Sequence, residues 1–206
     1  MKAVMGSLVS LLMGCVLIMA PVGAEESAEV SLQQARTELM SAVFEVTLSG
    51  DVDFDFSQLM VAHQSAGVQM AELMLDKTDN ERLGRVAELI VKKHRDEIEA
   101  FDTWLGRYDE ANPDDDAQLI RQTYQTVLDQ FADDRGEFQV EGDAETVFAH
   151  AMVWHHELVV SLGQVILNHS VDAQLRILAG DVVREANRDI AELRNWMQTR
   201  ELESSQ

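Results

Sequence analysis

Residues 51–105 read DVDFDFSQLMVAHQSAGVQMAELMLDKTDNERLGRVAELIVKKHRDEIEAFDTWL. Apolar side chains recur in this segment every three or four positions, which is the spacing of one face of an α-helix. They form two runs, one from Phe56 to Met74 and one from Leu83 to Trp104, and the polar residues 76–80 separate the runs. The segment therefore predicts a helical hairpin, in which one helix is followed by a short turn and a returning helix.

The same pattern returns further along the chain. A shift of 92 residues aligns residues 51–105 with residues 143–197 without a gap. The coinciding pairs include Phe56 with Phe148, Met60 with Met152, His63 with His155, Ile98 with Ile190 and Trp104 with Trp196. An ungapped register in which Met, His and Trp all coincide predicts an internal repeat with two core hairpins.

Two further segments, residues 30–48 and 117–132, have helical spacing, and each precedes one hairpin. Residues 109–116 between the copies include five acidic residues and predict an exposed acidic linker. No segment shows the alternation of a strand. We therefore predict an all-α helical bundle with a first repeat over residues 25–108, a second over residues 117–206, and additional flanking helices.

The N-terminus has the layout of a secretory signal peptide. Lys2 precedes an apolar segment, residues 3–20, and the compact residues Val22 and Ala24 precede Glu25. This order predicts cleavage after Ala24, a signal peptide over residues 1–24, and a periplasmic or secreted protein. Two alternatives stay open: an uncleaved anchor, since about 18 apolar residues can marginally span a bilayer, and a lipoprotein that carries its lipid on Cys15.

Charge and cysteine content exclude several classes of function. The chain holds 16 Lys and Arg against 37 Asp and Glu, a net charge of −21, and loss of Lys2 with the signal would make it −22. Such a charge excludes nucleic acid as a partner and favours cations, although a solvated acidic coat explains it equally well. Cys15 is the only cysteine, so the cleaved chain would hold no disulfide and no cysteine metal site. No membrane insertion is expected after cleavage of the signal peptide.

The segment Met60-Val61-Ala62-His63-Gln64-Ser65-Ala66-Gly67-Val68-Gln69-Met70-Ala71, with Ala87-Glu88-Leu89-Ile90, Glu97-Ile98 and Trp104-Leu105, resembles the domain of unknown function (DUF) 305 family. The resemblance implies a ferritin-like helical bundle, export, and in some members copper binding through Met and His. The chain departs from the family pattern at Gln64, where the second His is usual, at His94, where Gln is usual, and at Leu162, where Met is usual.

Helix geometry places the candidate ligands close together. Met60 and His63 are three positions apart, so a helix puts them on one face. If the first hairpin turns between residues 78 and 79, residues whose numbers sum to 157 lie level, which sets His63 opposite His94 and Met60 opposite Glu97 near the open end of the hairpin. The same rule in the second hairpin sets Met152 opposite Asp189, His155 opposite Ala186 and His156 opposite Glu185.

Thioether and imidazole groups are ligands of copper. The sequence therefore predicts copper as the metal, with ligands drawn from Met60, His63, Met70, His94, Glu97, Met152, His155 and His156. The alternative is that the methionines fill a core and the histidines are hydrogen-bonded interior groups.

These residues predict an exported metal-binding protein that buffers copper, confers resistance to it or passes it to a protein partner. A non-metal helical interaction scaffold and a ferritin-like di-metal oxidase are the alternatives. No enzyme is expected and no catalytic residue is assigned, because the sequence contains no Glu-x-x-His, no Gly-x-Ser-x-Gly and no His-Glu-x-x-His motif.

Overall fold

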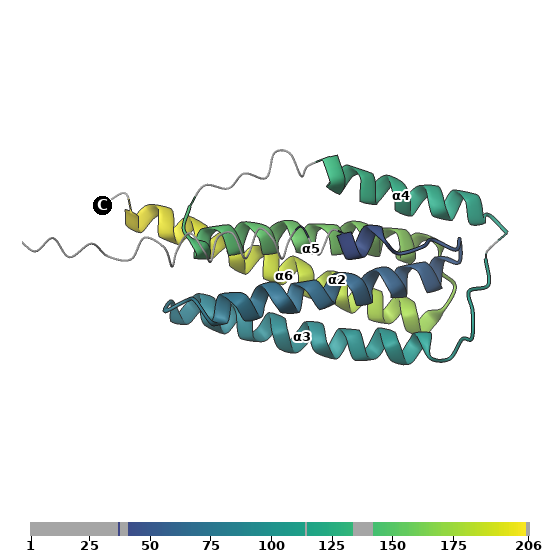
Figure 1. Cartoon of the computed structure of the whole chain (residues 1–206), viewed down its shortest axis with the longest axis horizontal. Coiled ribbons are helices and arrows are strands. Elements are labelled where there is room, and N and C mark those ends of the chain that lie inside the picture. The colour runs from purple at the N-terminus through teal and green to yellow at the C-terminus, as the bar shows by residue number, and fades with distance from the viewer. Residues whose placement is uncertain (1–36, 38–40, 114, 134–141, 205–206) are drawn as a thin grey trace, which may run out of the picture.

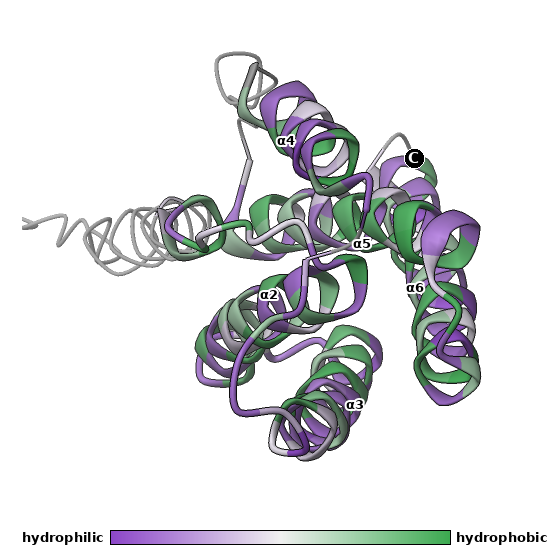
Figure 2. Ribbon diagram, turned by 90° about the vertical axis from the view of Figure 1, so that its right-hand side faces the viewer, coloured by the Kyte–Doolittle hydropathy of each residue, from purple (hydrophilic) through white to green (hydrophobic). Residues whose placement is uncertain are grey.

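The computed structural model of the chain describes residues 37, 41–113, 115–133 and 142–204. Four long helices form a bundle: α2 (Val52–Leu75), α3 (Glu81–Leu105), α5 (Ala144–His169) and α6 (Ala173–Ser204) (Figure 1). Helix α4 (Ala117–Asp133) lies outside these four, beside α5 and away from α3 (Figure 2). The described ranges contain no strand, and the predicted all-α bundle is confirmed.

Polar residues fix where the helices begin. The carboxylate of Asp51 accepts hydrogen bonds from the first turn of α2, and the side chains of Asn80 and Asp143 do the same for α3 and α5. Each cap satisfies amide groups that have no partner within the helix. The aligned segments at 51 and 143 thus begin at equivalent caps, and the predicted polar turn at residues 76–80 separates α2 from α3.

The apolar face predicted from helical spacing is the buried face. The residues of the first hairpin that recur at helical spacing are buried, except Ile98, which is half-buried: Phe56, Met60, His63, Gly67, Met70, Met74, Leu83, Ala87, Ile90, His94, Phe101 and Trp104. Equivalent residues of the second hairpin, including Phe148, Met152, Leu175 and Trp196, complete the same core. Removal of this apolar surface from water is the main source of stability for such a bundle.

The two hairpins point in opposite directions. The turn between α2 and α3 lies at one end of the bundle, and the turn between α5 and α6 lies at the other (Figure 1). Thr78 in the first turn donates to Glu145 at the start of α5 over 2.5 Å, while the Trp104 indole near the end of α3 donates to Asp172 in the second turn over 3.4 Å. With this head-to-tail arrangement, residues in the middle of one hairpin meet residues in the middle of the other.

The segment before α2 ties α4 to the bundle. Asp55 is fully buried, and its carboxylate accepts hydrogen bonds from the Ser49 amide and hydroxyl, both at 2.7 Å, and from the Gly50 amide at 2.8 Å. From α4, Arg121 donates to the Ser49 carbonyl at 2.6 Å, and the buried Tyr124 hydroxyl donates to the Val52 carbonyl at 3.0 Å. One cluster of polar contacts therefore fixes the start of α2 and the position of α4.

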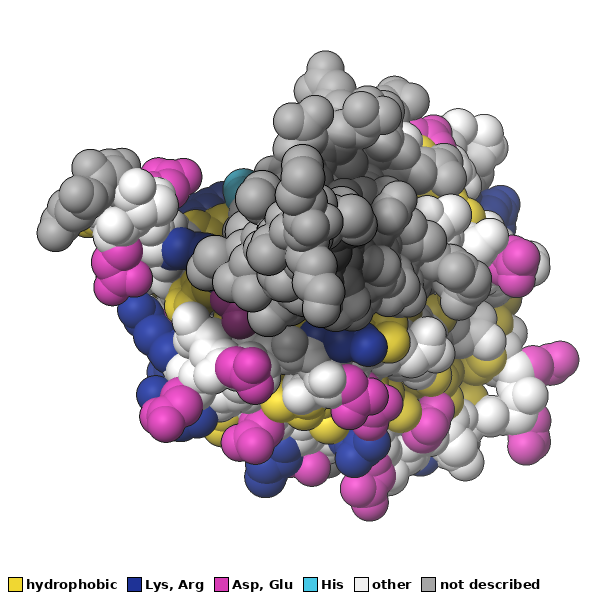
Figure 3. Space-filling model, turned by 60° about the vertical axis from the view of Figure 1, so that its left-hand side comes forward, with side chains coloured by type: hydrophobic (Ala, Val, Ile, Leu, Met, Phe, Trp, Pro, Cys, Tyr) yellow, Lys and Arg dark blue, Asp and Glu magenta, His cyan; other side chains and the backbone are white. Residues whose placement is uncertain are grey.

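Several predictions concern residues outside the described part. The signal peptide over residues 1–24, Cys15 and most of the helix predicted at residues 30–48 belong to this group. Within the described part, no helix is long and apolar enough to cross a membrane. Acidic side chains are spread over the face shown in Figure 3, where Lys and Arg alternate with them.

Candidate metal centre

Four histidines are buried at the middle of the bundle. His63 lies midway along α2, His94 midway along α3, and His155 and His156 midway along α5. Their exposed fractions are 0, 3, 0 and 1%. The predicted location near the open end of one hairpin is therefore wrong, because each histidine lies about as far from one end of its helix as from the other.

His155 is the centre of this histidine cluster. Its ring stacks on that of His63, with centroids 3.8 Å apart, and meets His156 edge-on at 5.2 Å. Its Nε2 lies 3.2 Å from Nε2 of His94, so one of the two nitrogens donates to the other. Since His63 and His94 belong to the first hairpin, both hairpins contribute to a single cluster.

Gly67 makes the close approach of the rings possible. A Cβ atom at this position would lie 2.5 Å from Cδ2 of His94 and 2.6 Å from Nε2 of His155. Any side chain on this face of α2 would therefore occupy the space where the two rings meet.

Hydrogen bonds fix the tautomer of two histidines. Nδ1 of His63 lies 3.2 Å from Oε1 of Gln64, and Nδ1 of His156 lies 2.7 Å from the Met152 carbonyl. Because both partners are acceptors, each Nδ1 carries the hydrogen and each Nε2 carries a lone pair. Both Nε2 atoms are buried without a hydrogen-bond partner. This is how ligating histidines are held in metalloproteins, with one nitrogen donating and the other free for the ion.

Carboxylates border the cluster. Nδ1 of His94 and of His155 also lack a hydrogen-bond partner, and Nδ1 of His94 is 3.4 Å from Oε2 of Glu97. The Gln64 amide donates to the same Glu97 oxygen. Nε2 of His156 is 3.6 Å from Oδ2 of Asp189 on α6. All four histidines thus hold a buried nitrogen without a hydrogen bond, and two of these nitrogens face carboxylates.

Burial keeps the imidazoles uncharged. Desolvation lowers the pKa of His63 from 6.5 to about 3 and that of His94 and His156 to about 4, and it lowers the pKa of His155 well below its usual value. Desolvation raises the pKa of Glu97 to about 7. Near neutral pH the rings are therefore uncharged. Nε2 of His63 and of His156 carry lone pairs, and so does Nδ1 of whichever of His94 and His155 donates to the other.

The prediction of which residues face each other across a hairpin, made from residue numbers that sum to a constant, is wrong by about one helical turn in both hairpins. Gln64, rather than Met60, meets Glu97, and His156, rather than Met152, meets Asp189. His94 lies against Gly67 instead of opposite His63. Helical side chains lean toward the N-terminus of their own helix, so on antiparallel helices the residues that touch lie further along each chain than residues at equal height.

The remaining candidates have simpler surroundings. Met60, Met70 and Met152 are fully buried in the hydrophobic core, and a role for their sulfur atoms as ligands stays a prediction. His169, at the end of α5, is exposed. Trp104 and Trp196 are 4% exposed and pack in the core.

The cluster fits a metal in its donor types but not as a finished site. Metal–imidazole bonds of about 2.0–2.1 Å put two nitrogens on one ion about 2.8–3.4 Å apart for angles of about 90–110°. The 3.2 Å between the Nε2 atoms of His94 and His155 falls in this range, and an ion bound to both would replace the hydrogen that they share. Among the residues described, however, no three His, Cys, Asp or Glu side chains have donor atoms positioned to hold one ion. Binding by three or more of these ligands requires ring rotations.

Sequence reasoning missed Lys93 and gave Asp189 no role of its own. Nζ of Lys93 lies 2.9 Å from Asp189 and 3.1 Å from Glu185, which joins α3 to α6 beside the cluster. Burial lowers the pKa of Lys93, but the hydrogen bonds and charges of Asp189 and Glu185 together outweigh that effect and raise the pKa overall. The repeat contained a signal for Asp189, because the shift of 92 residues makes it the counterpart of Glu97.

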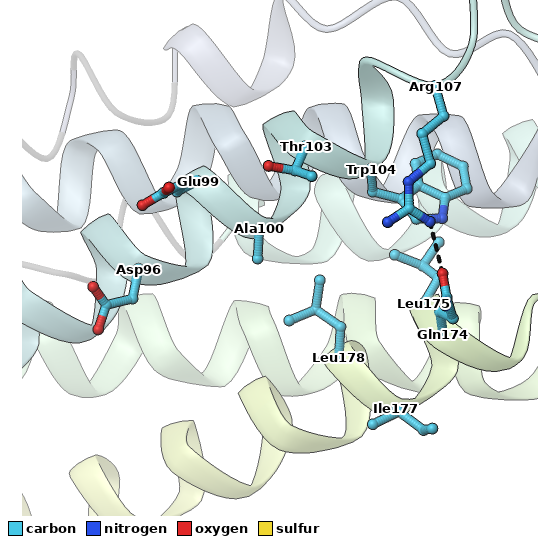
Figure 4. A pocket seen from close by; sticks show the side chains of 10 residues that line it. All are labelled: Asp96, Glu99, Ala100, Thr103, Trp104, Arg107, Gln174, Leu175, Ile177 and Leu178. Atoms are coloured by element: carbon cyan, nitrogen blue, oxygen red, sulfur yellow. Dashed lines mark hydrogen bonds between the residues drawn. The ribbon is translucent and has the colours of Figure 1, made fainter.

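A groove lies between α3 and α6, away from the histidines. Its volume is about 540 Å³, and its lining includes Asp96, Glu99, Trp104, Leu175, Ile177 and Leu178. Figure 4 shows these side chains from α3 and α6, with Arg107 donating to Gln174 at one end of the groove.

Comparisons with known proteins agree with this fold. The profile described as domain of unknown function (DUF305) matches residues 53–197. A structure of CopM in the silver-bound form, obtained by soaking, is 22% identical with a TM-score of 0.55, over 71% of this chain and 95% of that chain. CopM in the Cu(I)-bound form is 22% identical with a TM-score of 0.53, over 71% and 96%. A DUF305 fragment from Deinococcus radiodurans is 17% identical with a TM-score of 0.53, over 72% and 96%. No curated protein matches the sequence.

Proposed function

The chain belongs to the DUF305 family, and on this premise we propose that it is an exported metal-binding protein that holds copper at the histidine cluster. The N-terminal signal layout supports export. The role is to buffer the metal, protect against it or pass it to a partner protein.

The observation that carries the proposal is the set of four buried histidines that each keep one nitrogen without a hydrogen bond. A buried polar atom without a hydrogen-bond partner lowers the stability of the folded state by about 1–3 kcal/mol. Four such atoms in one cluster are therefore unfavourable if the cluster serves only to pack the core. Three of these nitrogens carry a lone pair, which coordination of an ion would satisfy. The fourth carries a hydrogen, because the ring of the His94–His155 pair that accepts at Nε2 is protonated on Nδ1. The neutral state of the rings supports the same role, because only an unprotonated nitrogen binds a metal.

Copper is the metal that best matches these donors. Imidazole accepts both copper states, and thioether groups favour the cuprous ion. We assign His63, His94, His155 and His156 as the principal ligands. Glu97 and the core methionines Met60, Met70 and Met152 complete the candidate set. The similarity to CopM, which has been solved with Cu(I), Cu(II) and silver, supports this choice.

The di-metal oxidase alternative has less support. Ferritin-like di-iron centres are built mainly from glutamates, with a Glu-x-x-His motif on each of two helices. Here the buried donors are four imidazoles, with Glu97 and Asp189 at their edge. This donor set is softer than that of a carboxylate-bridged pair of metals.

Copper titration of the purified protein tests the proposal. Cuprous or cupric ions at about 100 times Kd should stabilise the native state by about 2.7 kcal/mol. For a chain of this size that raises Tm by about 5–10 °C. The double variant His63→Gln, His155→Gln should lose most of this shift.

The matched control is the double variant His150→Gln, His169→Gln, which removes two histidines outside the cluster. It should keep the wild-type shift with copper. If neither ion raises Tm, or if the two double variants respond alike, the histidine cluster is not a copper site.

A further inference from the structure

A narrow crevice between α3 and α6 leads from the surface to the histidine cluster. It is too tight to admit a water molecule. Its lining includes Lys93, His94, Glu97, His156, Glu185 and Asp189. The unpartnered nitrogens of two of these residues, Nδ1 of His94 and Nε2 of His156, are buried at its inner end. The crevice thus offers carboxylates toward the outside and open imidazole nitrogens toward the inside.

One ammonium group stands among the carboxylates. Lys93 contacts both Glu185 and Asp189, and its side chain is 27% exposed, against 29% for Glu185 and 13% for Asp189. An ammonium group is compact and singly charged, and it carries three donors that compete for the same oxygens as a metal ion. Any cation that reaches the inner nitrogens by this route must replace Lys93 at these oxygens or pass it.

The repeat shows why Lys93 lies directly over the cluster. At the shift of 92 residues, His63 corresponds to His155 and Lys93 corresponds to Glu185. Both pairs of counterparts meet, the first by ring stacking and the second as an ion pair. In a two-fold arrangement only residues beside the axis meet their own counterparts. One approximate axis therefore passes through the histidine stack and the Lys93–Glu185 pair.

We propose that Lys93 is a built-in cation that closes the metal site, so that its ammonium and an incoming metal ion compete for the carboxylates at the mouth of the crevice. This inference rests on the proposed function and adds how access to the site is controlled. Lys93 is not a ligand. It sets the affinity of the histidines and the rate at which an ion reaches them.

Titration with cupric ions of the full chain and three variants tests the inference. Lys93→Met removes the ammonium and keeps the aliphatic stem. It should tighten copper binding on the order of tenfold, the effect of removing one like charge several ångströms from a divalent ion, and it should speed association. Lys93→Arg keeps the charge and should bind copper within about twofold of the wild type, because it restores the competing cation.

Lys92→Met is the matched control. Lys92 is the neighbouring residue, its side chain is 74% exposed, and it pairs with Asp96 on the surface. The substitution changes the net charge by the same amount, and it should leave the copper affinity within about twofold, because solvent screens an exposed charge.

The outcomes separate the inference from the function on which it rests. Equal tightening in Lys93→Met and Lys92→Met means that net charge alone acts, which overturns the closing role. Weaker binding in Lys93→Met overturns it too, because Lys93 would then support the site. If Lys93→Met folds poorly, Lys93→Gln replaces it, because this variant also removes the ammonium group and should tighten copper binding to the same extent. If the wild type binds no copper while its histidine variants behave identically, the proposed function itself fails.

Discussion

The missing side chain at Gly67 lets the rings of His94 and His155 come together. A Cβ atom there would lie within 2.6 Å of both rings, in a packed core where neither can move away freely. Gly67→Ala should therefore lower the free energy of unfolding by about 1–3 kcal/mol, the usual cost of overpacking. Urea unfolding followed by circular dichroism measures this change.

Gly180→Ala is the control for helix propensity. Gly180 lies within α6, and a Cβ atom there would meet no heavy atom within 4 Å. This substitution should stabilise the protein by about 0.5–1 kcal/mol, because alanine is the better helix former. If Gly67→Ala raised stability as much as Gly180→Ala, the rings would not occupy the space beside Gly67.

At the level of helices, the sequence predicted more about each hairpin than about how the hairpins meet. Helical spacing located the turn at residues 76–80 and a helix at residues 117–132, close to the observed Ala117–Asp133. The repeat, the family resemblance and the chemistry of Met and His as ligands identified the four histidines as candidates. The pairing across each hairpin was wrong by one turn, because equal height on two helices differs from contact between leaning side chains.

Contacts between the hairpins could not be read from the spacing. Each repeat specifies which face is buried, and several arrangements of two hairpins bury both faces. The stacking of His63 on His155 and the Lys93–Glu185 pair exist only because the hairpins run head to tail. The repeat supplies equivalent positions, but only the packing shows which of them meet.

The attachment of α4 gives a prediction at this scale. Tyr124 is fully buried, and its hydroxyl donates to the Val52 carbonyl at the start of α2. Tyr124→Phe should lower the free energy of unfolding by about 1–2 kcal/mol, because the buried carbonyl loses its hydroxyl donor. Thermal unfolding of the two proteins at one pH measures the difference.

The chain's other tyrosine provides the comparison. Tyr108 is 45% exposed, and its ring packs on Trp104. Tyr108→Phe keeps that ring contact and should change stability by less than about 0.5 kcal/mol, as most surface substitutions do. Equal effects of the two substitutions would show that the Tyr124 hydroxyl does not fix α4.

At the scale of the whole molecule, charge and burial act in opposite places. The net charge of −21 lies largely on exposed Asp and Glu side chains, which attract cations to the surface (Figure 3). The interior instead holds histidines that burial keeps neutral. The acidic surface thus attracts a cation, while the imidazole nitrogens that could bind it are buried at the crevice that Lys93 helps to line.

The buried histidines also make the metal-free protein sensitive to acid. Between pH 6.5 and about 4, histidines protonate in the unfolded chain but stay neutral in the folded one, since burial lowers their pKa values. The unfolded state then binds more protons than the folded state. As the pH is lowered, the free energy of unfolding therefore decreases by up to about 1.4 kcal/mol per pH unit for each histidine. Glu97 has the opposite sign: its pKa is raised to about 7, so between pH 7 and 4.5 it favours the folded state on acidification and offsets one histidine.

The four histidines destabilise the folded state on acidification, and Glu97 offsets only one of them, so the protein should lose stability as the pH falls. Urea unfolding at pH 7, 6 and 5 measures this loss. His63→Gln, His155→Gln removes two of the groups and should reduce the slope of unfolding free energy against pH by about half or more. A slope that is unchanged in this variant, or a wild-type stability that is flat between pH 6.5 and 5, would mean that the rings are not held neutral.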